Sequence, residues 1–264
     1  MVIDFHTHAF PDSIAERAIA GLLKASENRF LPCSDGTLGR LKNNMDKFGV
    51  DISVVQPVIT KASQLKTLNE WAKSIESDKI ISFGGIYPHT DDYKSDIDFV
   101  VSLGLKGLKF HPEYQDFVLD DKKMLPIYDY ALSKGLMLLF HAGFDPAYQP
   151  PFRSNPKMFS NILNELKGGT IIAAHLGGQQ QWDDVIEELC GKDIYLDTSM
   201  GFKYFTKEQF LKVVELHGVD KILFGSDSPW SRADEEIASL KAMPISEEDK
   251  QKIFYLNAKK LLSI

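Results

Sequence analysis

The residues best suited to chemistry stand at the start of the chain, where the sequence MVIDFHTH ends in two histidines separated by one residue. The apolar residues Val2, Ile3 and Phe5 predict a short buried strand, and side chains two positions apart in a strand point to the same face. His6 and His8 would therefore place two imidazoles side by side, which is half of a metal site. Two surface histidines are the plainer interpretation, so the metal hypothesis depends on ligands from elsewhere in the chain.

The other histidines are placed to supply such ligands. Six of the seven histidines, at positions 6, 8, 89, 111, 141 and 175, end or follow apolar runs that we interpret as strands. Only His217 lies elsewhere, before Gly218, where an imidazole simply meets a helix C-terminus. The stretch FGSDSP adds the carboxylate of Asp227 after the last apolar run. In a parallel α/β barrel the carboxyl ends of the strands converge on one mouth, where active sites form.

This placement predicts a metal site. Neutral imidazole nitrogens together with one carboxylate oxygen are donors that borderline divalent ions such as Zn²⁺ accept. We therefore predict one divalent metal, with zinc favoured, held by His6, His8, His141 and Asp227. Each residue alone has an ordinary structural interpretation, because a strand-end histidine is commonly a hydrogen-bonded rim residue and Asp227 could cap the following helix. Their joint placement around one barrel mouth is what favours the metal.

The elements that must position these residues are short apolar runs alternating with longer helical patterns. The predicted strands, whose β-branched and aromatic content suits burial on both faces, are Val2–Phe5, Ile52–Val58, Ile80–Ile86, Gly107–Phe110, Leu136–Phe140, Thr170–Ala174, Ile194–Asp197 and Lys221–Phe224. The predicted helices are Ser13–Ser26, Thr37–Phe48, Lys61–Ser77, Tyr93–Leu103, Lys122–Lys134, Pro156–Lys167, Gln180–Cys190, Thr206–His217 and a last helix that opens with a capping-box pattern at Ser246. Eight such units without a composition break predict an α/β fold, a single (β/α)8 TIM-barrel domain over residues 1–264.

Composition sets the expected class and partners. The chain has 264 residues and a net charge of −7, which argues against nucleic acid or an anionic membrane as the main partner. Its two cysteines, Cys33 and Cys190, offer no disulfide framework, and no apolar run reaches the ~18 residues of a membrane helix. We expect a soluble, cytoplasmic protein that acts on a small-molecule substrate, with a homodimer left open.

Several stretches together resemble the amidohydrolase superfamily. More narrowly, they resemble the amidohydrolase-2 branch, which contains α-amino-β-carboxymuconate-ε-semialdehyde decarboxylase and many TIM-barrel metal-dependent hydrolases. The matching stretches are Asp4–His8, Gly107–Pro112, Phe140–Gly143, Ala174–Gly177, Gly225–Pro229 and Asn257–Leu262, in the expected order. The resemblance implies that His6, His8, His141 and Asp227 hold the metal and that His175 stands beside the metal-bound water.

Two reactions are compatible with this arrangement. A divalent metal lowers the pKa of a bound water toward about 7; Asp227 would accept its proton, and His175 would orient the water or polarise a substrate carbonyl. This predicts a metal-dependent hydrolase of a small amide, lactone or ester. The alternative is a metal-dependent, non-oxidative decarboxylase of an unsaturated or aromatic carboxylic acid, which needs a cationic grip on the leaving carboxylate. A barrel that binds without turnover is a third hypothesis, and the joint presence of His175 and Asp227 argues against it.

Lys109 and His111 raise the question of a second metal. The two side chains share the inward parity of one predicted strand. A carboxylated Lys109 would bridge two metals, but His111 and Pro112 so close by resemble the single-metal branch, so we expect one metal only. Lys109 would then remain an ammonium that binds a substrate carboxylate, and His111 would line the pocket.

Residues further along the chain complete the predicted pocket. Arg153, in the long loop 143–155, would clamp a substrate carboxylate through both guanidinium nitrogens. Phe144 and Trp230 would form apolar walls. Asp4 and Asp197 are expected to face inward and orient the ligands.

Overall fold

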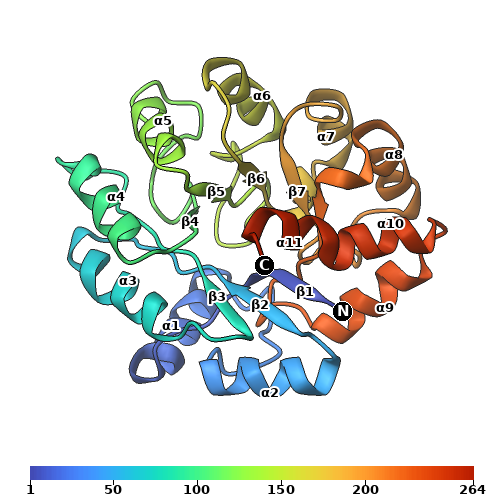
Figure 1. Cartoon of the computed structure of the whole chain (residues 1–264), viewed down its shortest axis with the longest axis horizontal. Coiled ribbons are helices and arrows are strands. Elements are labelled where there is room, and N and C mark those ends of the chain that lie inside the picture. Colours follow the sequence, from blue (N-terminus) through green and yellow to red (C-terminus); the bar gives the residue numbers. More distant parts are fainter.

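Eight short parallel strands alternate with helices in the computed structural model, which describes residues 1–264 (Figure 1). The strands are β1 (Ile3–Thr7), β2 (Ile52–Val55), β3 (Ile80–Ser82), β4 (Gly107–Phe110), β5 (Met137–Phe140), β6 (Ile171–Ala173), β7 (Tyr195–Asp197) and β8 (Ile222–Leu223). All eight predicted strands are present, which confirms the predicted α/β class and TIM-barrel architecture. The strands are almost fully buried on both faces, as their continuous apolar runs predicted.

Helices form an outer ring around the strands, and the last helix lies across their centre (Figure 1). They are α1 (Asp12–Ala25), α2 (Leu38–Phe48), α3 (Leu65–Ser74), α4 (Tyr93–Ser102), α5 (Leu125–Ser133), α6 (Pro156–Glu165), α7 (Trp182–Glu188), α8 (Lys207–His217), α9 (Ala233–Ala242), α10 (Glu247–Gln251) and α11 (Asn257–Leu262), with a π-helical turn η4 (Lys252–Leu256) between the last two. α10 begins where the capping pattern predicted, with the Ser246 side chain accepting the Asp249 N–H. α9 was not predicted, because only Ile237 and Leu240 form an apolar stripe on it. None of these helices combines the length and apolarity that crossing a membrane requires.

The strands pair as two sheets, β1-β2-β3 and β4 to β8 in chain order, and backbone hydrogen bonds cross both gaps between them. At one gap, Gly84 donates to the Gly107 carbonyl at 2.8 Å and Lys109 donates to the Gly84 carbonyl at 3.0 Å. At the other gap, Phe5 donates to the Phe224 carbonyl and Asp227 donates to the His6 carbonyl, both at 2.8 Å. The eight strands therefore surround one interior, and their carboxyl ends share one mouth.

Two predicted strands end at least three residues early. β2 stops at Val55 instead of Val58 and β3 at Ser82 instead of Ile86. The side chain of Asn69 accounts for the second case: its Oδ1 accepts the Gly85 N–H at 2.9 Å and its Nδ2 donates to the Gly85 carbonyl at 2.9 Å. A buried side-chain amide thus satisfies the backbone groups that a neighbouring strand would otherwise pair.

The histidine-bearing strand β1 carries an irregularity that the sequence did not indicate. Ile3 and Phe5 pack inside the barrel, so strict alternation would turn His6 outward. The pairing of β1 with β2 shifts register between Asp4 and Thr7. Such a bulge re-aims side chains, and here both His6 and His8 face the mouth.

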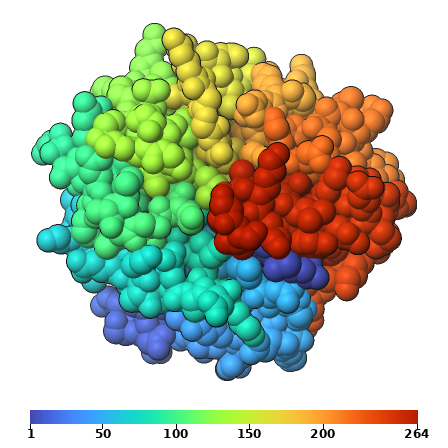
Figure 2. All heavy atoms as spheres, viewed as in Figure 1, coloured from blue at the N-terminus to red at the C-terminus, as the bar shows by residue number.

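The opposite end of the barrel is closed by the C-terminal helix. Ala258 and Leu262 of α11 belong to the same apolar cluster as the inward-facing residues Ile3, Phe83 and Leu139. Figure 2 shows this C-terminal segment lying across the centre of that face. Solvent is thereby excluded from the end remote from the histidines, and the mouth is left as the accessible end.

Truncating this plug should destabilise the whole barrel. Leu262 is fully buried, so Leu262→Ala is expected to lower the free energy of unfolding by about 2–5 kcal/mol in urea denaturation, through lost burial and a residual cavity. Leu256→Ala, on the adjacent turn but 41% exposed, is the matched control and should stay within about 0.5 kcal/mol of the parent chain. Equal effects of the two substitutions would contradict the plug.

Candidate active site

Three of the four predicted metal ligands converge at the mouth of the barrel. The Nε2 atoms of His6 and His8 are 3.2 Å apart. Asp227 Oδ1 lies 3.2 Å from His8 Nε2 and 3.5 Å from His6 Nε2. The donor atoms of these residues all lie within 4.8 Å of one another. Residues more than 200 positions apart in the chain are thus brought to one point by the ends of β1 and β8.

The hydrogen bonds of the other ring nitrogens decide which atoms face this point. His6 Nδ1 donates to Asp197 Oδ2 at 2.9 Å, and His8 Nδ1 donates to the Gln56 carbonyl at 2.8 Å. A neutral imidazole that donates from Nδ1 carries a lone pair on Nε2. The two Nε2 lone pairs and the carboxylate oxygen of Asp227 therefore point at one another across 3.2–3.5 Å. Such an arrangement is repulsive unless a positive charge lies beside the three atoms. The Lys109 ammonium meets only the His6 lone pair, so the His8 lone pair and the Asp227 oxygen are the observation that fits a further cation there.

His141, the fourth predicted ligand, has the same donor arrangement. His175 Nδ1 donates to the Ser199 carbonyl at 3.0 Å, so His175 Nε2 accepts from His141 Nδ1 at 3.1 Å. The remaining atom, His141 Nε2, is buried and has no hydrogen-bond partner. Its unpartnered lone pair also fits the role of a cation ligand. The donor atoms of His141, however, group with His111 and Asp145 and not with the other three ligands, so its role as a ligand stays a prediction.

Burial and charge keep these groups in the protonation states that a metal requires. Burial, reinforced by the Lys109 ammonium, lowers the pKa of His6 to about 4. Burial likewise lowers the pKa of His141 well below its ordinary value. For Asp227, burial alone would raise the pKa, but contact with His8 and the neighbouring His6 outweigh it and hold the pKa well below the usual range. The imidazoles of His6 and His141 are therefore neutral and the Asp227 carboxylate is ionised at neutral pH, as metal ligands must be.

The two predicted catalytic residues, His175 and Asp227, both have left-handed backbones. The φ angle is 56° at His175 and 65° at Asp227, a region that costs non-glycine residues energy. Gly225 lets the end of β8 approach β1, because an added Cβ would lie 2.9 Å from His6 Cβ. Strain and close approach are thus concentrated where the ends of β6 and β8 meet the first histidine.

Lys109 is buried on the floor of the site, 1% exposed, with Nζ 3.0 Å from His6 Nε2. Burial lowers its pKa to about 8, so the ammonium predominates at neutral pH. This ammonium and a metal ion would compete for the same lone pair of His6. Loading of a cation therefore requires the Lys109 side chain to turn away or to lose its proton.

His111 uses both of its ring nitrogens within the protein. Its Nδ1 accepts the Tyr114 N–H at 3.4 Å, and its Nε2 lies 3.4 Å from Asp145 Oδ2. The ring stacks between Tyr114 and His141, with centroid distances of 3.9 and 4.1 Å. His111 therefore holds the plane of the His141 ring. Asp145 was missed by the sequence analysis; its only signal is a carboxylate four residues after a strand-end histidine.

All these groups open onto one cavity of about 590 Å³. The predicted pocket residues Lys109, His111, Phe144 and Trp230 all line it. Arg153 does not line it. Its guanidinium pairs with Asp116 and lies 3.5 Å from Glu113 Oε2, so the structure places this predicted substrate clamp in a loop-to-loop contact instead.

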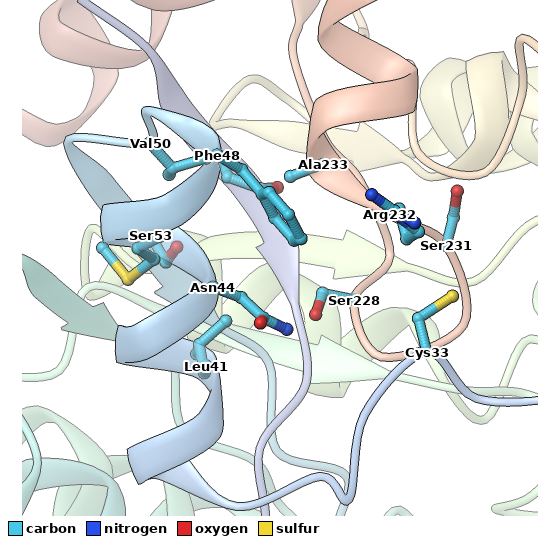
Figure 3. A pocket seen from close by; sticks show the side chains of 12 residues that line it. Cys33, Leu41, Asn44, Phe48, Val50, Ser53, Ser228, Ser231, Arg232 and Ala233 are labelled. Carbon is cyan, nitrogen blue, oxygen red and sulfur yellow. The ribbon is translucent and has the colours of Figure 1, made fainter.

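The two predicted orienting aspartates have different surroundings. Asp197 contacts His6 directly, as predicted. Asp4 instead faces outward and accepts from Ser226 N at 2.8 Å and Ser226 Oγ at 2.6 Å. It borders a small cavity of about 10 Å³ between β1 and α2, which Figure 3 shows with Ser53 and Asn44 on its wall. Such a volume suits a single water, and burial raises the pKa of Asp4 to about 7. Asp4 therefore supports the turn after β8 and not a histidine ring.

Comparison with known proteins identifies the family. The family model described as Amidohydrolase matches residues 3–264. The chain belongs to the amidohydrolase family. No curated protein matches it.

Solved structures share the fold of this amidohydrolase at low sequence identity. An uncharacterized TIM-barrel protein from Bordetella bronchiseptica is 18% identical with a TM-score of 0.78, covering 99% of this chain and 98% of its own. The 5-carboxyvanillate decarboxylase from Sphingomonas paucimobilis is 13% identical with a TM-score of 0.73, covering 100% and 99%. A probable 2-pyrone-4,6-dicarboxylic acid hydrolase from Acinetobacter baumannii, with citric acid bound, is 15% identical with a TM-score of 0.68, covering 100% and 99%. A decarboxylase and a probable hydrolase thus share this fold.

Removing the first histidine should remove the metal. His6→Ala leaves only His8 and Asp227 of the three converging donors. Elemental analysis of the purified variant is therefore expected to find no divalent ion. His217→Ala is the control, because that ring, at the end of α8, accepts the Gly191 N–H and donates to the Ile194 carbonyl and contacts none of the site residues. Full occupancy in His6→Ala would refute the ligand assignment.

Replacing the Asp197 carboxylate, which accepts the His6 Nδ1–H, should also weaken metal binding. Asp197→Asn keeps the shape but allows the amide to donate, which disfavours the Nδ1–H form of His6. We expect metal affinity to fall by about 10–100-fold in competition with a chelator. An unchanged affinity would mean that the tautomer of His6 does not depend on this contact.

Proposed function

We propose that this amidohydrolase is a metal-dependent hydrolase of a small amide, lactone or ester. The observation that carries the proposal is the convergence of His6, His8 and Asp227, with His175 close by, on the floor of one cavity of about 590 Å³. The nitrogen and carboxylate donor set favours a divalent ion, and zinc first. Such an ion, when bound, acts as a Lewis acid and makes water nucleophilic near neutral pH.

The residues of the chain supply the proton transfers. Asp227 is ionised and only part of its carboxylate faces the histidines, so the other oxygen can hold a proton and return it to a leaving group. His175 is held by the Ser199 carbonyl, with its ring centroid 5.4 Å from that of His6. This places an imidazole beside the reacting centre, where it can orient a nucleophile or polarise a carbonyl.

Decarboxylation of an unsaturated or aromatic acid is the second candidate, because it needs the same floor plus a cation to grip the leaving carboxylate. Lys109 is the cation on the floor, and its position 3.0 Å from His6 favours this alternative. Arg153, the other predicted grip, is paired with Asp116 outside the cavity. Of the two candidates for this single grip only Lys109 lies on the floor, and its ammonium is already bonded to the His6 lone pair that a metal would use; for this reason hydrolysis is the preferred reaction.

The proton-transfer role of Asp227 can be separated from metal binding. Asp227→Asn keeps an oxygen donor but cannot take up a proton as a carboxylate does. Turnover of the best substrate in a panel of p-nitrophenyl esters and aryl lactones should fall by about 10²–10⁴-fold, while elemental analysis still finds metal on His6 and His8. Turnover at the parent rate, with metal present, would remove this role.

The choice between the two reactions can be tested through the products. A panel that pairs each aromatic carboxylic acid with its ester should yield alcohol and acid from the ester and no CO₂ from the acid. Lys109→Met should leave ester turnover within about ten-fold, because hydrolysis does not require a second cation. CO₂ release that Lys109→Met abolishes would overturn the hydrolase proposal in favour of the carboxy-lyase.

A further inference from the structure

The outer half of the cavity is bordered by the faces of two helices. Residues of α1 that line it are spaced three and four apart: Ile14, Arg17, Ala18, Gly21 and Leu22. Leu68 and Trp71 of α3, three apart, line it as well. Figure 1 shows α1 next to α3 in the outer ring. Apart from Arg17, these wall residues carry no charge, so this half of the cavity offers apolar surface to a ligand.

Arg17 differs from every other arginine of the chain. The sequence has five arginines. Four of them pair with a carboxylate of the protein: Arg29, Arg40, Arg153 and Arg232. Arg17 has no such partner, and it is the only arginine that lines the cavity. A guanidinium is an always-charged donor fork suited to carboxylates and other oxyanions, and here it is left free to meet one from a ligand.

The floor and the rim of the cavity have different exposure. His6, Lys109 and His175 are buried, at 0%, 1% and 4% exposure, whereas Arg17 and Lys61 are exposed lining residues. The acidic lining residues, Asp145 and Asp227, are both buried beside histidines. Positive charge without a matching acid therefore marks the exposed rim. Apart from Gly21, the uncharged residues of the two helix faces are intermediate in exposure, between that rim and the buried floor.

We propose that the substrate is amphipathic: a reacting carbonyl at the floor, an apolar segment between α1 and α3, and an anionic group held by Arg17 at the rim. This inference rests on the proposed hydrolysis for the identity of the reacting end, but the anionic subsite itself does not. Because the guanidinium is solvated, its contact is expected to strengthen binding by only about five-fold. Arg17 therefore determines specificity without taking part in the bond that breaks.

Binding of matched acids and amides tests the subsite directly. The probes are 3-phenylpropionate, 6-phenylhexanoate and 8-phenyloctanoate, each compared with its neutral amide by isothermal titration calorimetry on the metal-loaded protein. At the length that spans floor to rim, the acid should bind about five-fold more tightly than the amide, and Arg17→Gln should abolish the difference. Arg40→Gln, which alters an arginine on α2 paired with Asp35, should leave it unchanged.

A second pair of variants tests the charge without touching Arg17. Gly21 lies one turn after Arg17, and a Cβ added there has no neighbour within 4 Å, so larger residues are accommodated. Gly21→Glu should abolish the preference for the acid by neutralising the guanidinium and repelling the ligand. Gly21→Gln, of the same shape and uncharged, should keep it.

The outcomes separate this inference from the proposed reaction. Equal binding of acid and amide at all three lengths, or binding of neither, overturns it, as does a preference that survives Arg17→Gln. A preference lost only in Lys61→Gln would overturn the assignment to Arg17. A clear Arg17-dependent preference in a protein that hydrolyses no ester would sustain the subsite while refuting the hydrolase. Ester turnover without any preference for the acid would sustain the hydrolase and refute the subsite.

Discussion

The rest of the site depends on the hydrogen bonds that the buried carboxylate of Asp197 accepts. It is fully buried, and an ionised carboxylate in that position is costly unless it is fully hydrogen-bonded. Its oxygens accept from His6 Nδ1 at 2.9 Å, His175 N at 3.2 Å and Ser199 N at 3.0 Å, as well as from Ser199 Oγ. Although burial would raise its pKa, the adjacent His6 outweighs burial and holds the pKa well below the usual range. One anion thus joins the ends of β1, β6 and β7 and fixes the tautomer of His6.

The barrel could be read from the sequence because its strands are buried on both faces and therefore appear as continuous apolar runs. The features that were not predicted, the early end of β3 and the bulge in β1, depend on contacts between residues far apart in the sequence. The early end of β3 depends on the side chain of Asn69, sixteen residues away from Gly85. The bulge in β1 depends on pairing with β2, some fifty residues away. Neither the sequence of β1 nor that of β3 carries a local mark of these events.

The candidate site likewise contains residues that the sequence predicted and residues that it did not. Strand-end positions predicted that His6, His8 and Asp227 would meet, because the geometry of a barrel carries every strand end to one mouth. Residues on loops and helices obey no such rule. Arg153 was predicted to be a substrate clamp from its type and its place in a long loop, yet Glu113 and Asp116, on another loop, contact its guanidinium. Arg17, on an ordinary-looking amphipathic helix, gave no signal, because being the one unpaired arginine is a property of the folded chain.

The location of positive charge bears on which reaction this floor performs. A carboxylate that leaves as CO₂ must sit on the floor beside the reacting groups, where Lys109 is the one cation and competes with a metal for the lone pair of His6. A carboxylate held at the rim by Arg17 lies beyond the apolar faces of α1 and α3 and would survive the reaction unchanged. A binding site for an anion that is kept orients the substrate and plays no part in expelling CO₂. The separation of an exposed cation from a buried reacting centre therefore fits the proposed hydrolysis, in which the anion positions the substrate at the rim while the bond breaks at the floor.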